Sequence, residues 1–533
     1  MRPHAIKLRP HAIKLLCAAV TATFATAAVP AFAAEDAAFW YRDGQAALAE
    51  AKRLHPNMRR AKNVIFFVGD GMGVSTVTAA RILEGQLQNR DGERNQLAFE
   101  RLPYLALSKT YSVNQQTPDS APTMTAMVSG IKTNDGMFGV APAVKRGEKD
   151  AAVIDANKIP SLLHLAEKSG RATGVVSTAR ITHATPGATY AHISERNCER
   201  DTQVPAGATV KDIASQLIDN FGAGKVGDGI EVVLGGGRRE FLPNTLNDPE
   251  DAGARGRRGD GRNLAAEFES KFNGQFVWDK AGFDNFDPAS GKRLLGLFEQ
   301  SHMEYEHDRA NDAGGEPSIA EMTEKAIEVL KRNDKGFFLM VEGGRIDHAH
   351  HAGNAYRALT DAIAMSDAVK KAMEMTDPED TLIVVSADHS HVFTIAGYPK
   401  RGNPILGKVV TPGKDAPNYA LAQDGNPYTT VSYANGRGYH VDVPGDDVYG
   451  APVAAGRVAD MRTVDTTDPD FHQEALVPLG SETHAGEDVA IYAGGPKAHL
   501  FHGTREQNYI FHVMQDAFRG KHKHKHEDVE ERD

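Results

Sequence analysis

The stretch Asn63-Val-Ile-Phe-Phe-Val-Gly-Asp70-Gly-Met-Gly73 decides the fold that we predict for this chain. An unbroken apolar run that ends in a Gly-Asp-Gly turn is typical of a strand buried on both faces of a parallel sheet. Such a strand presents Asp70 at its carboxyl end. The stretch therefore predicts a core strand with a carboxylate at the edge of the sheet.

The same design recurs along the chain, in apolar runs at residues 173–178, 231–237, 336–342 and 381–388. Amphipathic helices are predicted between several of these runs, at residues 160–169, 319–332 and 355–375. Strands that alternate with helices indicate an α/β protein, a three-layer α/β/α sandwich with a mainly parallel central sheet. Polar residues that follow the strands then meet at one edge, where such sheets bind their ligands.

The N-terminus has the pattern of an export signal. Basic residues precede a short apolar stretch at residues 15–28, and Ala31-Phe-Ala33-Ala34 fits a cleavage site. The apolar stretch is too short to span a bilayer comfortably, and the C-terminus lacks an apolar tail. We therefore expect residues 1–34 to be a signal peptide, the protein to be periplasmic or secreted, and no membrane anchor to be present.

Residues 35–520 are predicted to form one catalytic domain. It opens with a helix at 36–53 that packs on the body or on a partner subunit. Residues 395–480, rich in Gly, Pro and Asp, are expected to form an inserted irregular or β subdomain. The tail at 521–533, in which Lys and His alternate before a run of acids, is predicted to be disordered.

Composition and charge exclude several classes of partner. The chain of 533 residues is 41% hydrophobic and 25% charged, as in ordinary globular proteins, and its net charge is −11. An acidic surface argues against binding to nucleic acid or to anionic lipid. A site for an anionic ligand must therefore carry its own positive charge. Only Cys198 follows the predicted signal, so packing and metals, not disulfides, must hold the fold.

The densest polar cluster is Glu342-Gly-Gly-Arg-Ile-Asp347-His348-Ala-His350-His351. If a helix begins near residue 346, Asp347 and His351 are i, i+4 neighbours on one face. A carboxylate and an imidazole at that spacing suit Zn²⁺. The alternative, a solvated polar helix start, explains one acid but not an acid followed by three histidines.

A second cluster, Asp388-His389-Ser-His391, also follows an apolar strand. An adjacent Asp–His pair in a tight turn can reach one metal ion, although Asp388 alone would serve as an ordinary polar cap. Asp70 taken alone is equally compatible with a helix N-cap.

Ser120 lies in Thr117-Pro-Asp119-Ser120-Ala-Pro122, a turn that leads into a predicted helix. At a helix N-terminus, backbone N–H groups and the helix dipole favour an oxyanion and a phosphate. Simple capping by Asp119 or Ser120 is the better interpretation of this segment alone. Together with the acidic and histidine clusters, it favours a nucleophilic serine.

With these motifs in place, the chain resembles the alkaline phosphatase family, and it is more similar to the animal-type than to the short bacterial members. The resemblance runs in one order from about residue 62 to 518 through eight segments, at residues 69–73, 118–120, 180–186, 190–197, 235–238, 341–348, 387–393 and 483–488.

The resemblance implies hydrolysis of phosphate monoesters through a phosphoserine on Ser120, with Arg196 as the phosphate clamp, in a homodimer. It also implies three metal ions. The first zinc would be held by Asp347, His351 and His484, the second zinc by Asp70, Asp388, His389 and Ser120, and a magnesium by Asp70, Thr185 and Glu342 with His183 close by.

A calcium site is also implied, at Glu250, Glu299 and Glu316 with the backbone carbonyl of Phe298. Glu316 stands where animal-type relatives carry Asp, which puts this ligand in doubt. Pro122-Thr123-Met124 departs from the small residues usual after the nucleophile, without removing a ligand.

Two rival functions remain at this stage. A sulfatase or phosphodiesterase is suggested by Ser120-Ala-Pro-Thr-Met124, but Met124 lacks the guanidinium that the sulfatase pattern has there, and Arg196 would fill the space of a second ester group. A periplasmic metal-buffering protein is suggested by 22 histidines. Such a protein needs neither a serine at a helix start nor a clamping arginine.

Overall fold

The computed structural model describes residues 35–439, 457 and 460–519, which fall into two units divided after His55. The first unit contains helix α1 (Ala37–Ala51), which confirms the helix predicted for 36–53. Asp36 caps it by accepting a hydrogen bond from Phe39 N at 2.7 Å. Its packing partner stays a prediction. The predicted signal peptide (1–34) and the Lys/His tail (521–533) lie outside the described residues.

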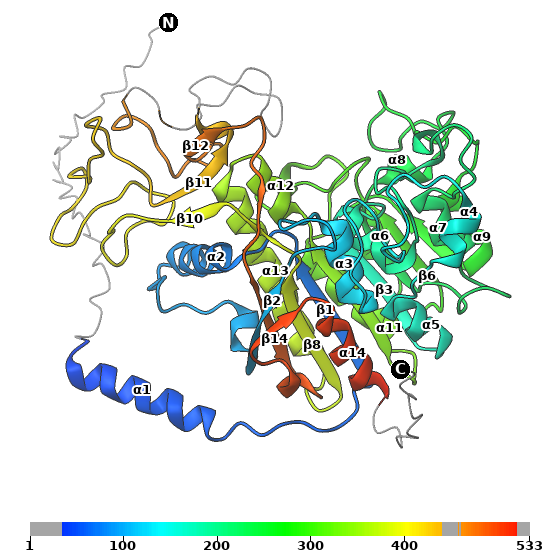
Figure 1. The fold of residues 1–533 in the computed structure, drawn as a ribbon, viewed down its shortest axis with the longest axis horizontal. Coiled ribbons are helices and arrows are strands. Elements are labelled where there is room, and N and C mark those ends of the chain that lie inside the picture. Colours follow the sequence, from blue (N-terminus) through cyan, green and yellow to red (C-terminus); the bar gives the residue numbers. More distant parts are fainter. Residues whose placement is uncertain (1–34, 440–456, 458–459, 520–533) are drawn as a thin grey trace, which may run out of the picture. The chain divides into compact units, whose positions relative to one another are not determined.

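The second unit is built on a ten-stranded sheet in the order β15-β2-β14-β8-β1-β7-β3-β4-β6-β5 (Figure 1). All neighbours are parallel except β14, which runs antiparallel to both β2 and β8. The mainly parallel sheet is therefore confirmed. The strands are β1 (Asn63–Gly69), β2 (Tyr104–Lys109), β3 (Ala172–Arg180), β4 (Val232–Gly236), β5 (Gly274–Val277), β6 (Arg293–Leu297), β7 (Phe337–Gly343), β8 (Thr381–Ala387), β14 (Val489–Gly494) and β15 (Thr504–Glu506).

Helices cover both faces of this sheet. Along β1, Phe66 packs in one hydrophobic cluster and its neighbour Phe67 in another, because successive side chains point to opposite faces. The first cluster includes residues of α3 (Ser120–Ser129), α5 (Leu162–Lys168), α6 (Ala184–Tyr190), α7 (Ile213–Asp219), α9 (Leu264–Phe272) and α14 (Tyr509–Arg519). The second includes residues of α2 (Val74–Leu87), α10 (Lys280–Asn285), α11 (Ile319–Leu330), α12 (Arg345–His351) and α13 (Ala355–Met375). Two short helices, α4 (Ala151–Ala156) and α8 (Arg238–Phe241), complete the set.

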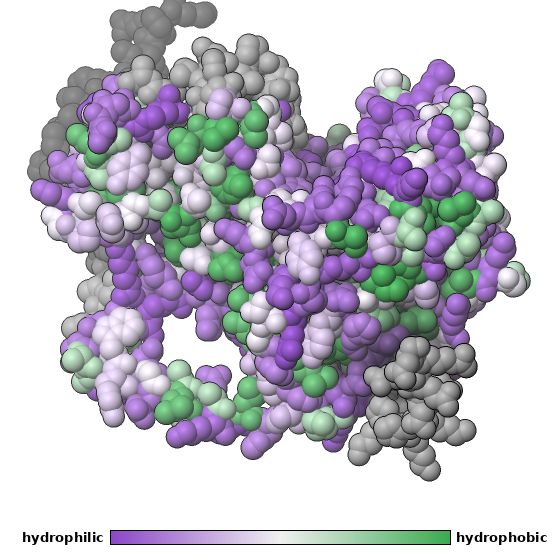
Figure 2. All heavy atoms as spheres, viewed as in Figure 1, coloured by the Kyte–Doolittle hydropathy of each residue, from purple (hydrophilic) through white to green (hydrophobic). Residues whose placement is uncertain are grey.

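This arrangement confirms the predicted three-layer α/β/α sandwich, and the predicted helices at 160–169, 319–332 and 355–375 correspond to α5, α11 and α13. The strands are buried along almost their whole length in β1, β3, β7 and β8. Figure 2 shows the complementary pattern, a face that is mainly hydrophilic with separate hydrophobic patches.

The register of the central strands brings the residues that follow them to one edge of the sheet. Gly69 is paired with Gly343 on one side and with Ala387 on the other, so β1, β7 and β8 end together. Asp70 and Asp388 are the next residues after two of these ends. The carboxylates that the sequence places after apolar runs therefore lie at the same edge of the sheet.

A smaller sheet of β10 (Phe393–Ile395), β11 (Val431–Gly436) and β12 (Ala475–Pro478) confirms a small inserted β subdomain, although its predicted limits at 395 and 480 stay a prediction. A separate two-stranded ladder joins β9 (Ser390–His391) to β13 (His484–Ala485). In this ladder His391 is paired with His484, so the chain leaves and re-enters the main body at adjacent points.

Candidate active site

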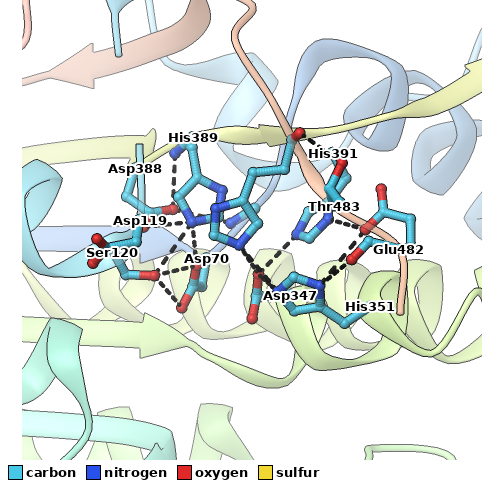
Figure 3. A network of polar contacts seen from close by, with 12 residues as sticks. Asp70, Asp119, Ser120, Asp347, His351, Asp388, His389, His391, Glu482 and Thr483 are labelled. Atoms are coloured by element: carbon cyan, nitrogen blue, oxygen red, sulfur yellow. Dashed lines mark hydrogen bonds and ion pairs between the residues drawn. The ribbon is translucent and has the colours of Figure 1, made fainter. Parts of the chain in front are cut away.

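Ser120 begins helix α3, as predicted. Asp119 caps the helix with an extended backbone, and its carboxylate accepts a hydrogen bond from Ala121 N at 2.9 Å. Ser120 Oγ donates to Asp70 Oδ1 at 3.3 Å and lies 3.2 Å from His389 Nε2 (Figure 3). The hydroxyl is buried, and it is in contact with two residues that the sequence proposes as metal ligands.

Asp70, Asp388 and His389 form the group around this hydroxyl, and all three are fully buried. His389 Nε2 lies 3.4 Å from Asp70 Oδ1 and 3.2 Å from Asp388 Oδ2. Asp388 Oδ1 also accepts the N–H of Gly71 at 3.0 Å. The structure thus brings together residues from the ends of β1 and β8 and from the start of α3.

Asp347, His351 and His484 form a second group. Asp347 and His351 are i, i+4 neighbours in α12, as predicted, and Asp347 Oδ1 lies 3.4 Å from His351 Nε2 and 3.3 Å from His484 Nε2. The other ring nitrogens face backbone carbonyl oxygens. His351 Nδ1 lies 2.6 Å from the carbonyl oxygen of Glu482, and His484 Nδ1 lies 2.7 Å from that of Pro118.

This arrangement fits a metal ion. A carbonyl oxygen only accepts, so both Nδ1 atoms carry hydrogen, and Nε2 is the nitrogen of each ring that can bind a metal ion. The two Nε2 atoms lie 3.0 Å apart, beside a carboxylate oxygen. Two lone pairs and a negative oxygen directed to one point suit a tetrahedral cation such as Zn²⁺.

Glu342, Thr185 and Asp70 form the third predicted group. Ser177 Oγ donates to Glu342 Oε2. Among the described residues, Glu342 Oε1 and Thr185 Oγ1 are buried without a hydrogen-bond partner. Burial raises the pKa of Glu342 to about 7. Buried oxygens without a partner are costly, and a hard cation with oxygen ligands such as Mg²⁺ would satisfy them.

The buried acids oppose one another electrostatically. Burial, followed by the nearby carboxylates of Asp388 and Asp347, raises the pKa of Asp70 well above its ordinary value. Burial also raises the pKa of Asp388 and lowers the pKa of His389. A site of crowded carboxylates and neutral imidazoles is a site that cations would stabilise.

Arg196 supplies the local positive charge that the acidic chain requires. Its Nη1 donates to Asp119 Oδ1 at 3.0 Å, and its backbone N–H donates to the Gly136 carbonyl at 2.8 Å. Its Nη2 lies 3.2 Å from His183 Nε2. Arg196 is therefore held by Asp119, the residue next to Ser120, and its guanidinium group also contacts His183.

Four residues near the site have no role in the sequence prediction. His391 lies with Asp347, His351 and His484, and Glu482 contacts two of these histidines. The signal for His391 was present in Asp388-His-Ser-His391. His348 follows Asp347 and His302 lies in a loop, and together with His183 they form another cluster of imidazoles.

The His183–His302–His348 cluster faces arginines. His302 Nε2 lies 2.5 Å from Arg180 Nη1, and His348 Nδ1 lies 3.2 Å from Arg345 Nη1. Guanidinium groups only donate, so each imidazole contributes a lone pair to an arginine. The cluster therefore serves as a set of acceptors for guanidinium groups.

The predicted calcium residues are only partly brought together. Glu250 and Glu299 lie within reach of one ion, and the third carboxylate there is Asp312, which the prediction missed. Glu316 instead accepts the N–H of Glu304 with both oxygens at 3.1 Å, and burial raises its pKa to about 9. Phe298 is buried beside Glu299 at the end of β6.

Buried carboxylates and imidazoles around a serine at a helix N-terminus, at the edge of an α/β/α sheet, define a metal-dependent hydrolase. A family model described as alkaline phosphatase matches residues 61–519, and the chain belongs to that family. It is a phosphoric monoester hydrolase with alkaline phosphatase activity, and the family uses zinc and magnesium.

Similar proteins agree with this assignment. The tissue-nonspecific alkaline phosphatase isozyme of Gallus gallus is 44% identical over 491 residues, 90% of this chain and 89% of that protein. The corresponding Homo sapiens isozyme is 43% identical over 90% of this chain and 88% of its own length. The Thermus thermophilus alkaline phosphatase structure has a TM-score of 0.61 at 25% identity, over 89% of this chain and 94% of that one.

No helix in the described part of the chain is both long enough and apolar enough to span a membrane.

Proposed function

We propose that the chain hydrolyses phosphate monoesters through a covalent phosphoserine at Ser120. The contacts of Ser120 Oγ with Asp70 and His389 support this role. We assign the first zinc to Asp347, His351 and His484, the second zinc to Asp70, Asp388, His389 and Ser120, and a magnesium ion to Asp70, Thr185 and Glu342, with His183 nearby.

When bound, the zinc ions would lower the pKa of a hydroxyl or a water and offset negative charge on the reacting oxygens. Arg196 binds two non-bridging phosphate oxygens, because a planar guanidinium donates two parallel hydrogen bonds. Its bond to Asp119 holds it in place beside the nucleophile.

Asp70, which is hydrogen-bonded to Ser120 Oγ, takes the serine proton as this oxygen attacks phosphorus. The Oγ–phosphorus bond forms while the bond from phosphorus to the ester oxygen breaks, and the leaving oxygen takes a proton from water, which leaves hydroxide. This hydroxide attacks the same phosphorus, the Oγ–phosphorus bond breaks, and Oγ regains its proton from Asp70 as inorganic phosphate departs.

The Ser120→Ala variant tests this proposal. Ala is tolerated at the first position of α3 and leaves the Asp119 cap in place. Turnover of p-nitrophenyl phosphate should fall by at least about 10³-fold, and acid quenching with radiolabelled substrate should trap no phosphoprotein. A labelled phosphoserine in this variant would refute the assignment.

Substrate choice separates this function from its rivals. We expect p-nitrophenyl phosphate to be hydrolysed far faster than bis-p-nitrophenyl phosphate or p-nitrophenyl sulfate. Arg196, which Asp119 holds beside Ser120, would occupy the space that a second ester group needs. Preference for the diester or the sulfate would favour the phosphodiesterase or sulfatase alternative.

Export and assembly belong to the same proposal. We propose that residues 1–34 are removed on export to the periplasm or medium, that the mature protein is a homodimer, and that calcium binds near Glu250 and Glu299. N-terminal sequencing of the exported protein tests the first part, and light scattering tests the second.

A further inference from the structure

Glu482 contacts two histidines of the site through two different groups. Its backbone carbonyl accepts the Nδ1–H of His351 at 2.6 Å. Its carboxylate lies 2.5 Å from His391 Nδ1 and accepts the N–H of Val392 at 2.8 Å. The residue is 1% exposed, and Figure 3 shows it beside both rings, with contacts to each. A buried carboxylate with this many partners is held in one orientation.

The carbonyl of Glu482 determines which nitrogen of His351 is available. The hydrogen bond places the ring hydrogen on Nδ1 and leaves the lone pair on Nε2. That Nε2 atom is the one that lies 3.0 Å from His484 Nε2. Glu482 thereby orients one proposed zinc ligand toward another.

The carboxylate of Glu482 acts on a third proposed ligand through His391. The ring of His391 lies between two carboxylates, with Nδ1 at Glu482 and Nε2 at 2.8 Å from Asp347 Oδ1. The contact with the Glu482 carboxylate fixes the orientation of the ring, and the other side of the ring contacts Asp347. His391 therefore links Glu482 to Asp347.

The ring of His391 is also fixed from the side. Gly71 has a φ of +69°, and a Cβ atom at this position would lie 2.3 Å from the ring. Gly71 allows the backbone to pack directly against His391. The link from Glu482 to Asp347 is therefore rigid.

We propose that Glu482 is a positioning residue of the first zinc site, which orients His351 through its carbonyl and Asp347 through His391. This inference rests on the function proposed above. Partners of metal ligands in this position typically alter metal affinity by about 10- to 100-fold when they are changed. Glu482 is also two residues from the third proposed ligand, His484, so one short segment organises all three.

The Glu482→Gln variant tests the carboxylate alone, because the backbone carbonyl is unchanged. The amide oxygen can still accept from Val392, but its NH₂ group would oppose the N–H of His391. The probe is Zn²⁺ alone, titrated against a chromophoric chelator with the metal-depleted full-length protein. We expect zinc at this site to bind roughly 10- to 100-fold more weakly than in the wild type.

Glu474→Gln is the matched control. Glu474 lies in the insertion that precedes Glu482, accepts from Thr429 N at 3.2 Å and pairs with Arg457 at 2.6 Å, and these contacts involve no histidine of the site. Its zinc affinity should equal that of the wild type. Excess zinc should also restore phosphatase activity to Glu482→Gln, because the ligands themselves remain.

The outcomes separate this inference from the proposed function. If the wild-type protein binds no zinc, or if Asp347→Asn does not lower its affinity for zinc, the proposed function fails. If the wild type binds that zinc and Glu482→Gln binds it equally tightly, only the role of Glu482 is refuted. Should Glu482→Gln fail to fold, His391→Gln tests the same link, and unchanged zinc affinity in that variant overturns the proposal.

Discussion

Asp119 Oδ1 accepts a hydrogen bond from Arg196 Nη1 at 3.0 Å, while the same carboxylate caps the helix that Ser120 begins. Its other oxygen accepts the N–H of Gly136, whose carbonyl receives the backbone N–H of Arg196. One side chain therefore connects the proposed nucleophile to the proposed phosphate clamp.

Replacing Asp119 should weaken phosphate binding more than it slows turnover. In Asp119→Asn the helix cap is retained but the charge that holds Arg196 is lost, so the Ki of inorganic phosphate should rise about tenfold, or about 1.4 kcal/mol. Asp119→Ala should add about 1 kcal/mol of lost capping, seen as a lower melting temperature. An unchanged Ki in both variants would show that Arg196 does not depend on Asp119.

Thr185→Val should weaken magnesium binding without a cost to the metal-free protein. The hydroxyl of Thr185 is buried without a hydrogen-bond partner among the described residues, so its removal should leave stability unchanged or raise it by about 1 kcal/mol. Melting temperatures of chelated protein, with and without Mg²⁺, measure both effects. Thr189→Val, in the same helix, removes a hydroxyl that donates to Pro186 O at 2.6 Å. This control should lower the stability of the metal-free protein and leave magnesium binding unchanged.

Asp312, not Glu316, should be the third carboxylate of the calcium site. Asp312 lies with Glu250 and Glu299, whereas Glu316 is occupied by the backbone of Glu304. Calcium added to chelated protein should raise the melting temperature, and Asp312→Asn should remove more of this increase than Glu316→Gln. Equal losses in the two variants would restore Glu316 as a ligand.

A pair of buried acids far from the proposed metal ligands should make stability depend on pH. Burial raises the pKa of Glu167 from 4.5 to about 7, and burial with the charge of Glu167 raises the pKa of Glu231 to about 8. Their charged neighbours are Asp228 and Arg293. Between pH 4.5 and about 8 the folded state binds more protons than the unfolded state, so stability falls as pH rises.

Glu167→Gln should reduce this loss of stability with rising pH. The variant removes an ionisable group whose contribution is on the order of 1 to 3 kcal/mol, so it should gain stability relative to wild type at pH 8 and little at pH 5. Glu374→Gln, at an exposed position of α13, is the control and should follow the wild-type profile. Parallel profiles for all three proteins would contradict the prediction.

Local patterns predicted much of this molecule. The i, i+4 relation of Asp347 and His351 depends only on a helix that starts at the end of a strand, and the structure has that helix. The contact of Ser120 with Asp70 spans 50 residues of chain, but it follows from the rule that strand ends gather at one edge of the sheet.

The residues that were missed depend on the paths of loops. Asp312 and Glu316 lie in one irregular segment, where no periodicity indicates which carboxylate comes within reach of Glu250 and Glu299. His302 contacts Arg180 only because its loop returns to the end of β3. Glu482 reaches His391 through the pairing of β9 with β13, which lie far apart in sequence.

That ladder between β9 and β13 has a consequence for how the protein can vary. His391 and His484 are paired in this ladder, so the long segment between them starts and ends at two adjacent, fixed positions. The entropy of closing such a loop changes by only about 0.6 kcal/mol for each doubling of its length. The segment between His391 and His484 can therefore change in length and sequence during evolution while the residues of the site keep their positions.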